Sequence, residues 1–484
     1  MRRIIAALLV LGVVASGLIP SPPRGSPLTA GAAVKDRHYT RTPGKLILIR
    51  HGESLMNEQD TISGWIDADL SDNGRKEMEH ASRLMLERGY SNIDVVYTSR
   101  LRRTIRSAWV LLKELNSIFR PLENSWRLNQ RHFGAFEGVS KSRLVQEMGE
   151  ARVDEYRHSL FIRPPPMSPS HPHWHGNEDK YKELAGEDIL PSSESAYDCW
   201  QRVVPFYEEK IVPDLLAGKT VVVVGHANSL RGLIRRIDGL PDAEVQSLAL
   251  PSGIPVVYSF DQSLQPVQHP SRFAPLSACF LESPKALRLL LEKEKAWGNP
   301  EAEQYKGLYS LINYDDTSLM VPPATVPLMQ SLSTLERERH ALEQLGAESG
   351  DAAAVTQDGD EEQRKEHAAP ALASSLDPAD YSSSIGDRYI VFIRHGQTDY
   401  NKLGIFTGWD DAPLSAEGLT QAHEAGRLLR LHGIRFDVVY TSWLSRAIET
   451  AWAVVDELDL LWLPIIKSWR LNERMYGGEE TSVQ

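Results

Sequence analysis

The 484-residue sequence contains only two cysteines, Cys199 and Cys279, which are too few for a disulfide framework and stand in no metal-binding spacing. It also lacks an excess of positive charge, since its formal net charge at pH 7 is -12. Because non-specific affinity for nucleic acid comes from basic surface, this balance argues against a nucleic-acid-binding protein. A small anionic substrate remains compatible, because it needs only a local cluster of basic side chains.

Long apolar runs are missing too, with one exception near the N-terminus. Two arginines precede an apolar run from Ile4 to Ile19. The run is short for a bilayer-spanning helix, and it matches the charged and apolar regions of a secretory signal. We therefore expect a signal or targeting peptide over residues 1–25 and a spacer over 26–44. Such a peptide would send the protein into the secretory route or to an organelle.

One long passage occurs twice. The histidine of an Arg-His-Gly motif stands at His51 and again at His395, 344 residues later (395 − 51). The segment DVVYTS begins at Asp94 and at Asp437, and the offset there is 343 (437 − 94). This period far exceeds that of solenoid repeats, so it indicates tandem duplication of a whole domain.

Each copy alternates strand and helix signals. Apolar runs at 45–49, 94–99 and 220–226 are typical of strands buried on both faces, and helical spacing follows each of them. This alternation predicts an α/β fold with a mainly parallel sheet, whose sites lie at the carboxyl ends of the strands. The predicted organisation is a complete domain over 45–270 (repeat one), a helical extension over 271–344, a disordered linker over 345–387 and a truncated second domain over 388–484 (repeat two).

The Arg-His-Gly motif suits phosphoryl transfer. An imidazole such as that of His51 can attack phosphorus and carry the phosphoryl group, provided that the attacking nitrogen is unprotonated. The guanidinium groups of Arg50 and Arg103 match the charge on the transferred oxygens, and His226 can hydrogen-bond to them from a neighbouring strand end. Gly52 leaves room for a phosphate near the backbone.

These motifs together resemble the histidine phosphatase superfamily and, within it, the cofactor-dependent phosphoglycerate mutases. The general resemblance rests on R-H-G-E, Asn57, S-G-W, Arg103 and G-H-A-N-S. The resemblance to the mutases rests on TGWDDAPLSAEG, SWRLNERMYGG, RPPP and LPSSES. It covers residues 45 to about 267 and 388 to 484.

The resemblance implies a three-layer fold of helices, mostly parallel sheet and helices, and the interconversion of 2- and 3-phosphoglycerate. His51 would be phosphorylated by the priming cofactor 2,3-bisphosphoglycerate, with no metal; the partner is a small phosphorylated substrate, and a homo-oligomer is compatible. The implied catalytic residues are His51, His226, Arg50, Arg103, Gln130, His395 and Glu473. The implied substrate-binding residues are Asn57, Ser63, Gly64, Lys141, Arg157, Asn228, Arg394, Asn401, Thr407, Gly408 and Arg446.

Repeat one departs from the mutase pattern at the position of the general acid and base. The family has Glu where this chain has Gln130, and a carboxamide cannot exchange a proton at neutral pH. Phe133, His158 and Ala227 replace the usual Tyr, Arg and Gly. Repeat two keeps Glu473 at the equivalent position, but nothing that matches 220–226 follows it, so we expect that it does not close a normal core.

Three functions therefore stay open: a phosphoglycerate mutase of reduced activity, a phosphohistidine phosphatase with little mutase activity, and a binding protein whose two sites have relaxed. The intact His51 set favours the first two, whereas Gln130 favours the last two. The histidine-rich segment HPHWHG at 171–176 suggests a metal site, but it lies in a proline-rich loop without carboxylate or cysteine spacing, and we expect no metal there.

Overall fold

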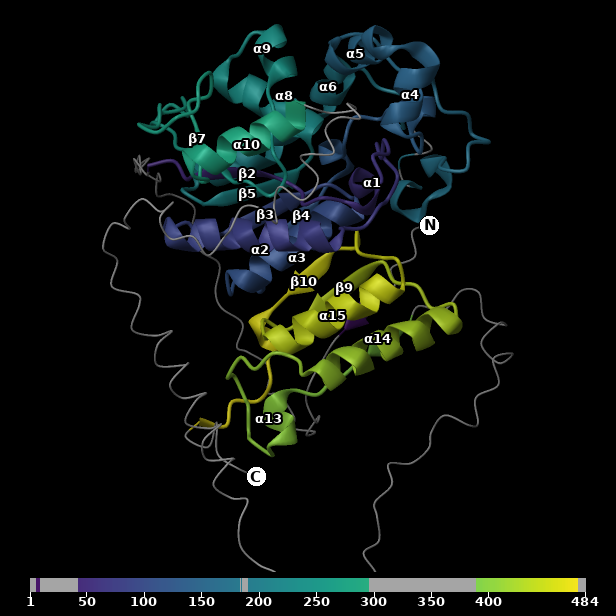
Figure 1. Ribbon diagram of the computed structural model, residues 1–484. Helices are drawn as coiled ribbons and strands as arrows, with labels where there is room; N and C mark the ends of the chain where they lie inside the picture. The colour runs from purple at the N-terminus through teal and green to yellow at the C-terminus, as the bar shows by residue number, and fades with distance from the viewer. Residues whose placement is uncertain (1–5, 9–41, 183, 185–189, 296–388, 478–484) are drawn as a thin grey trace, which may run out of the picture. The chain divides into compact units, whose positions relative to one another are not determined.

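A computed structural model describes residues 6–8, 42–182, 184, 190–295 and 389–477 (Figure 1). Both repeats belong to one compact unit of the chain. The predicted linker and most of the predicted signal peptide and spacer lie outside the described residues. Among the helices that the structure describes, none is both long and apolar enough to cross a membrane.

Repeat one is built on a six-stranded sheet with the order β4-β3-β5-β2-β6-β7. Strands β4, β3, β5 and β2 are parallel, and β6 is antiparallel to β2. The strands are β2 (Leu46–Arg50), β3 (Val95–Thr98), β4 (Leu122–Asn124), β5 (Val221–Gly225), β6 (Val256–Tyr258) and β7 (Cys279–Phe280). The sheet confirms the predicted α/β fold with a mostly parallel sheet.

Helices cover both faces of this sheet, with α2 and α3 on one side and α8 and α10 on the other (Figure 1). The helices of repeat one are α1 (Leu55–Glu58), α2 (Asp72–Glu87), α3 (Arg102–Glu114), α4 (Lys141–Met148), α5 (Glu150–His158), α6 (Ala196–Phe206), α7 (Val212–Leu216), α8 (Ala227–Asp238), α9 (Asp242–Ser247) and α10 (Pro284–Lys295). Short turns of helix lie at Trp126–Leu128, Gly134–Phe136, His175–Asn177, Asp179–Tyr181 and Tyr207–Ile211.

The alternation of side chains along β2 explains why its sequence is apolar throughout. Leu46 and Leu48 enter the core beneath α6 and α8, whereas Ile47 and Ile49 enter the core beneath α2 and α3. All four are at most 1% exposed. A strand buried on both faces cannot alternate apolar and polar residues.

The core of repeat one continues beyond residue 270. Strand β7 pairs antiparallel with β6, and Leu287, Leu290 and Leu291 of α10 pack into the same core as Leu46. Helix α10 lies within the range predicted as a helical extension, and it packs into the core of repeat one. The predicted boundary at residue 270 follows the end of the resemblance, whereas the packing continues through β7 and α10.

Repeat two has a four-stranded sheet with the order β10-β9-β1-β8. Its elements are β8 (Ile390–Phe392), α13 (Asp399–Lys402), α14 (Ala416–Leu431), β9 (Val438–Thr441), α15 (Ser445–Glu457), β10 (Ile465–Lys467) and a short turn at Trp469–Leu471. Strand β1 (Ala6–Leu8) pairs parallel with both β8 and β9. These three residues occupy the central position that β5 has in repeat one, although no segment matching 220–226 follows β10 in the sequence.

Candidate active site

His51 follows strand β2 directly and is held there by its backbone. Its amide donates to the carbonyl of Gly225 at 3.0 Å, and its side chain is 3% exposed. The Nδ1 atom lies 2.6 Å from the carbonyl oxygen of Gly52, so Nδ1 carries the proton in the neutral ring. The other nitrogen, Nε2, then keeps its lone pair, as an attacking nucleophile requires.

His226 follows the neighbouring strand β5, and its ring centroid lies 4.9 Å from that of His51 in an edge-on arrangement. Its Nε2 is 2.9 Å from the hydroxyl of Ser99, which follows β3. The parallel strands β3, β5 and β2 thus bring three polar side chains to one edge of the sheet. Sequence reasoning missed Ser99, although its segment DVVYTS occurs in both repeats.

Burial keeps both imidazoles neutral. The pKa of His51 is lowered well below its usual value, first by desolvation and then by the positive charges of Arg103 and Arg50. The pKa of His226 is lowered in the same way, with burial again the largest cause. An uncharged ring surrounded by positive charge is suited to receive a phosphoryl group, because protonation of Nε2 would compete with attack.

Arg103 lies in the first turn of α3 and is fully buried. Its Nη2 donates to the carbonyl of Gly64 at 2.7 Å, and its Nη1 donates to that of Ile66 at 2.8 Å. Burial lowers its pKa to about 10, so it stays charged at neutral pH. Arg50 donates to the carbonyl of Leu250 at 2.8 Å. Both guanidinium groups are therefore anchored by backbone carbonyls and fixed in place.

Gln130 is connected to the second half of the domain. Its side-chain oxygen accepts from Nδ2 of Asn228 at 3.2 Å, and its backbone carbonyl accepts from Nε1 of Trp65 at 2.7 Å. Asn228 lies in the first turn of α8, two residues after His226. The structure thus brings together the predicted general acid–base position, a predicted substrate contact and the second histidine.

A buried ion pair, which sequence reasoning missed, holds the loop that carries Gln130. Arg202 of α6 donates to the carbonyls of Arg127, Asn129 and Gln130 at 2.8, 2.9 and 2.8 Å. Its charge is balanced by Glu194, which is 2.7 Å from its Nε. Glu194 stands in the mutase-like segment LPSSES, but nothing in the pattern around Arg202 signals this role.

Three other predicted substrate contacts of repeat one are Asn57, Ser63 and Gly64. Asn57 lies within α1 and completes its capping box, since its Oδ1 accepts from the backbone N–H of the N-cap residue Ser54 at 3.2 Å. Gly64 has a φ of +46°, and a Cβ atom there would lie 1.9 Å from Oε1 of the buried Glu137. Ser63 precedes it in the same loop. Glycine is thus required at position 64 for both conformation and space.

Two predicted basic contacts lie on the helical insert after the Gln130 loop. Lys141 begins α4, and its Nζ is 3.0 Å from the carboxylate of Asp60. Arg157 lies on α5 and is 3.1 Å from the carboxylate of Asp154. The side chains of Lys141 and Arg157 are 12% and 25% exposed, whereas Arg50 and Arg103 place positive charge at His51.

The histidines of HPHWHG do not converge on one point. His171 and His173 are neighbours with ring centroids 5.7 Å apart, whereas His175 is buried and its Nδ1 lies 3.1 Å from Nε2 of His132. Burial lowers the pKa of His175 to about 4 and that of His132 to about 2. Within the described part of the chain, no group of three potential metal ligands occurs.

Repeat two reproduces the nucleophile half of the site. Nδ1 of His395 lies 2.6 Å from the carbonyl oxygen of Gly396, and burial lowers its pKa to about 4. Arg446 donates to the carbonyls of Gly408 and Asp410 at 2.8 and 3.0 Å, as Arg103 does at the equivalent positions. Among the other predicted residues, Thr407 is buried, Arg394 is exposed, and Asn401 and Glu473 are half-buried.

A region of each repeat matches the same family model. Residues 46–173 and 390–483 match the model of the histidine phosphatase superfamily, branch 1. A mycobacterial glucosyl-3-phosphoglycerate phosphatase is 20% identical, with a TM-score of 0.36, and the match covers 49% of this chain and 96% of that one. An alpha-ribazole phosphatase from Shigella flexneri is 21% identical, with a TM-score of 0.34 and coverage of 46% and 93%.

Proposed function

We propose that repeat one is the working enzyme and transfers phosphoryl groups through Nε2 of His51. Two regions of this chain match the histidine phosphatase superfamily. The observation that carries the proposal is the buried, neutral His51 ring, whose Nδ1 is occupied by the Gly52 carbonyl. Arg50, Arg103 and His226 surround the same position. The superfamily consists of phosphoryl-transfer enzymes, and this geometry is suited to that chemistry.

The first candidate reaction is the interconversion of 2- and 3-phosphoglycerate. In the priming step, Nε2 attacks a phosphorus of 2,3-bisphosphoglycerate, a P–N bond forms, the P–O bond to the sugar acid breaks, and the released oxygen takes up a proton. The phosphoryl group then passes to a hydroxyl of a monophosphoglycerate, which loses its proton. The mutase-like segments of the sequence support this substrate class.

The second candidate is hydrolysis of the same phosphohistidine by water. Gln130 favours it, because each mutase half-reaction must move a proton at the substrate hydroxyl and a carboxamide cannot carry that proton. Gln130 is nevertheless well placed to hold the hydroxyl, since its side chain is already oriented by Asn228. We expect repeat one to form phosphohistidine readily and to use it slowly in mutase turnover.

The test is phosphorylation of the full chain by 2,3-bisphosphoglycerate, followed by mass spectrometry of its peptides. We expect an acid-labile phosphate on His51 that is lost in His51→Ala. The matched control is His395→Ala, which should leave the label unchanged. The absence of label, or the same label after His51→Ala, would refute the proposal.

A further inference from the structure

Equivalent helices of the two repeats pack against each other. The indoles of Trp109 in α3 and Trp452 in α15 are stacked, with centroids 4.8 Å apart and an interplanar angle of 10°. These residues occupy the same position in their repeats (452 − 109 = 343). Ile105 and its equivalent Ile448 belong to the same apolar cluster. A contact between identical positions is the mark of a two-fold, isologous interface.

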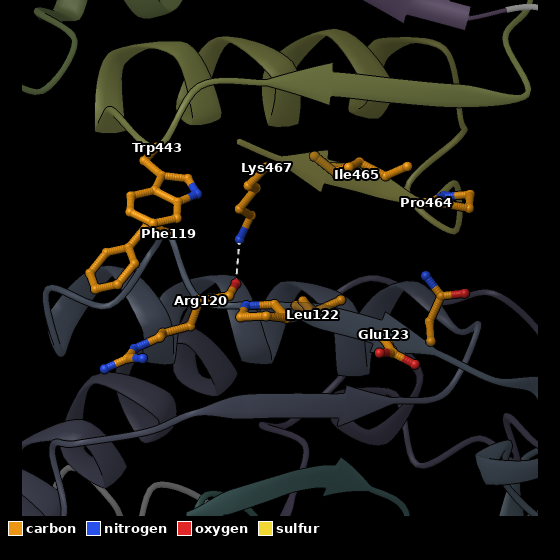
Figure 2. A pocket seen from close by; sticks show the side chains of 11 residues that line it. Phe119, Arg120, Leu122, Glu123, Trp443, Pro464, Ile465 and Lys467 are labelled. Carbon is orange, nitrogen blue, oxygen red and sulfur yellow. Dashed lines mark hydrogen bonds between the residues drawn. The ribbon is translucent and has the colours of Figure 1, made fainter. Parts of the chain in front are cut away.

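The surrounding contacts are reciprocal, as a two-fold relation requires. The guanidinium of Arg100 lies over the ring of Trp462 at 5.8 Å. Phe119, the equivalent of Trp462, contacts Trp443, the equivalent of Arg100, with centroids 6.3 Å apart. Figure 2 shows Phe119 and Trp443 facing each other at one end of this interface. The two repeats thus pair as the two halves of a symmetric dimer would.

The charges on this interface break the symmetry. In repeat one, the flanking positions of the helix are basic, Arg106 and Lys113, whereas the equivalent positions in repeat two are acidic, Glu449 and Asp456. Arg106 forms an ion pair with Asp456, and Lys113 forms one with Glu449. Arg102 adds a further contact to Asp456 at 3.3 Å.

We propose that this charge pattern selects the pairing of repeat one with repeat two of the same chain and excludes pairing of like repeats between chains. Two copies of repeat one would place Arg106 opposite Lys113 in both reciprocal contacts. Two copies of repeat two would place Glu449 opposite Asp456. Like charges at such close range oppose association, and this repulsion gives specificity as much as the matched pairs do.

A second difference between equivalent positions supports the same selection. Lys467 of β10 donates from Nζ to the carbonyls of Ile118 and Arg120 at 2.5 and 2.6 Å, and Figure 2 shows its side chain crossing to Arg120. The equivalent residue of repeat one is Asn124, which is shorter and uncharged. Burial lowers the pKa of Lys467 to about 7. This amine donor is specific to repeat two, and its acceptors belong to repeat one.

The experiment uses charge reversals in the full chain. R106E/K113E makes the facing positions of α3 and α15 all acidic, and E449K/D456K makes them all basic. Either double variant should abolish the exciton signal of the Trp109–Trp452 stack in circular dichroism. Either should also accelerate amide exchange in α3 and α15. Trp452→Phe defines the part of the signal that belongs to this stack. The matched control is R143E/R236E, two exposed charges whose ion-pair partners, Glu147 and Glu208, also belong to repeat one; it should change neither measurement.

Restoration of the signals by a fourfold variant is the decisive measurement. Arg106 also forms an ion pair with Asp69 within its own repeat, with 2.7 Å between Nε and Oδ1, so a loss of signal in R106E/K113E by itself has a local explanation. The fourfold variant R106E/K113E/E449K/D456K exchanges the signs and should restore both signals, with the chain a monomer in sedimentation. Unchanged signals in the double reversals, or failure of the fourfold variant to restore them, would overturn the proposal. A wild-type dimer that loses the Trp signal on dilution would also overturn it.

Discussion

The two repeats share the part of the site around the Arg-His-Gly histidine and differ in the residues that complete it. His51 and His395 have the same bond from Nδ1 to the next carbonyl, and Arg103 and Arg446 make the same pair of bonds to a loop. Repeat one adds His226 and the Arg202–Glu194 pair, but its loop carries Gln130. Repeat two keeps the carboxylate, Glu473. Among the described residues, each repeat therefore holds one part of the mutase-like sequence pattern that the other lacks.

The sheets differ even more than the sites. Leu46 and Leu48 are 0% and 1% exposed beneath α6 and α8, whereas their equivalents Ile390 and Phe392 are 58% and 64% exposed. In the described residues, repeat two has no counterpart of α6 or α8. The nucleophile loop forms without these helices because its bonds are local, whereas burial of that sheet face depends on them.

The largest expected effect is on folding. Residues 388–484 alone lack β1 and the covering helices, so their sheet has an interior gap and a bare apolar face. We expect no cooperative thermal transition in circular dichroism and no dispersed amide signals in NMR. Residues 42–295, which retain all six strands of their sheet, should show both. A sharp transition in the 388–484 fragment would contradict this difference in folding between the two repeats.

The next effect concerns the exchange of Gln and Glu between the two sites. Gln130→Glu should raise the mutase rate by roughly a hundred- to ten-thousand-fold, because it restores proton transfer at the substrate hydroxyl. Binding should change little, and phosphatase activity should rise less than mutase activity. Glu473→Gln is the matched control and should leave both rates unchanged. An unaltered mutase rate in Gln130→Glu, with His51 still phosphorylated, would shift attention to His158 and Phe133.

A smaller effect on the free energy of unfolding is expected when equivalent positions of the two sheets are truncated. Leu48→Ala removes a fully buried side chain and should lower the free energy of unfolding of repeat one by about 2–5 kcal/mol. Phe392→Ala removes an exposed side chain and should lower that of repeat two by less than about 1 kcal/mol. Chemical denaturation followed by hydrogen exchange in β2 and β8 measures the two separately. Equal losses would show that the β8 face is covered in solution.

The smallest expected change is an absence of titration. The pKa of His51 is well below the usual value of 6.5, and that of His395 is lowered to about 4, in both cases mainly by burial. Neither ring should take up a proton as the pH falls from 8 to 5. The measurement is NMR of labelled imidazole carbons, assigned with His51→Asn and His395→Asn. A midpoint near 6.5 for His51 would mean that its site is open to water.

The local elements were predictable because they depend on neighbours in the sequence. The apolar run 45–49 predicts a strand, and β2 lies there. The repeated Arg-His-Gly motif predicts the same local geometry twice, and Nδ1 of His51 and of His395 each lie 2.6 Å from the next carbonyl oxygen. That these two histidines are nucleophiles stays a prediction. The parallel sheet followed from strand–helix alternation. It also followed that His51 and His226 meet, because the carboxyl ends of parallel strands share one edge.

Only the tertiary structure decided the contacts that join distant parts of the chain. Arg202 bonds to a carbonyl 72 residues away, Asn228 bonds to a side chain 98 residues away, and β1 enters a sheet formed from the other end of the protein. The opposite charges of Arg106 and Asp456 are visible in the sequence, but their pairing is not. No periodicity links such residues, since their proximity depends on how complete elements pack rather than on local chain geometry.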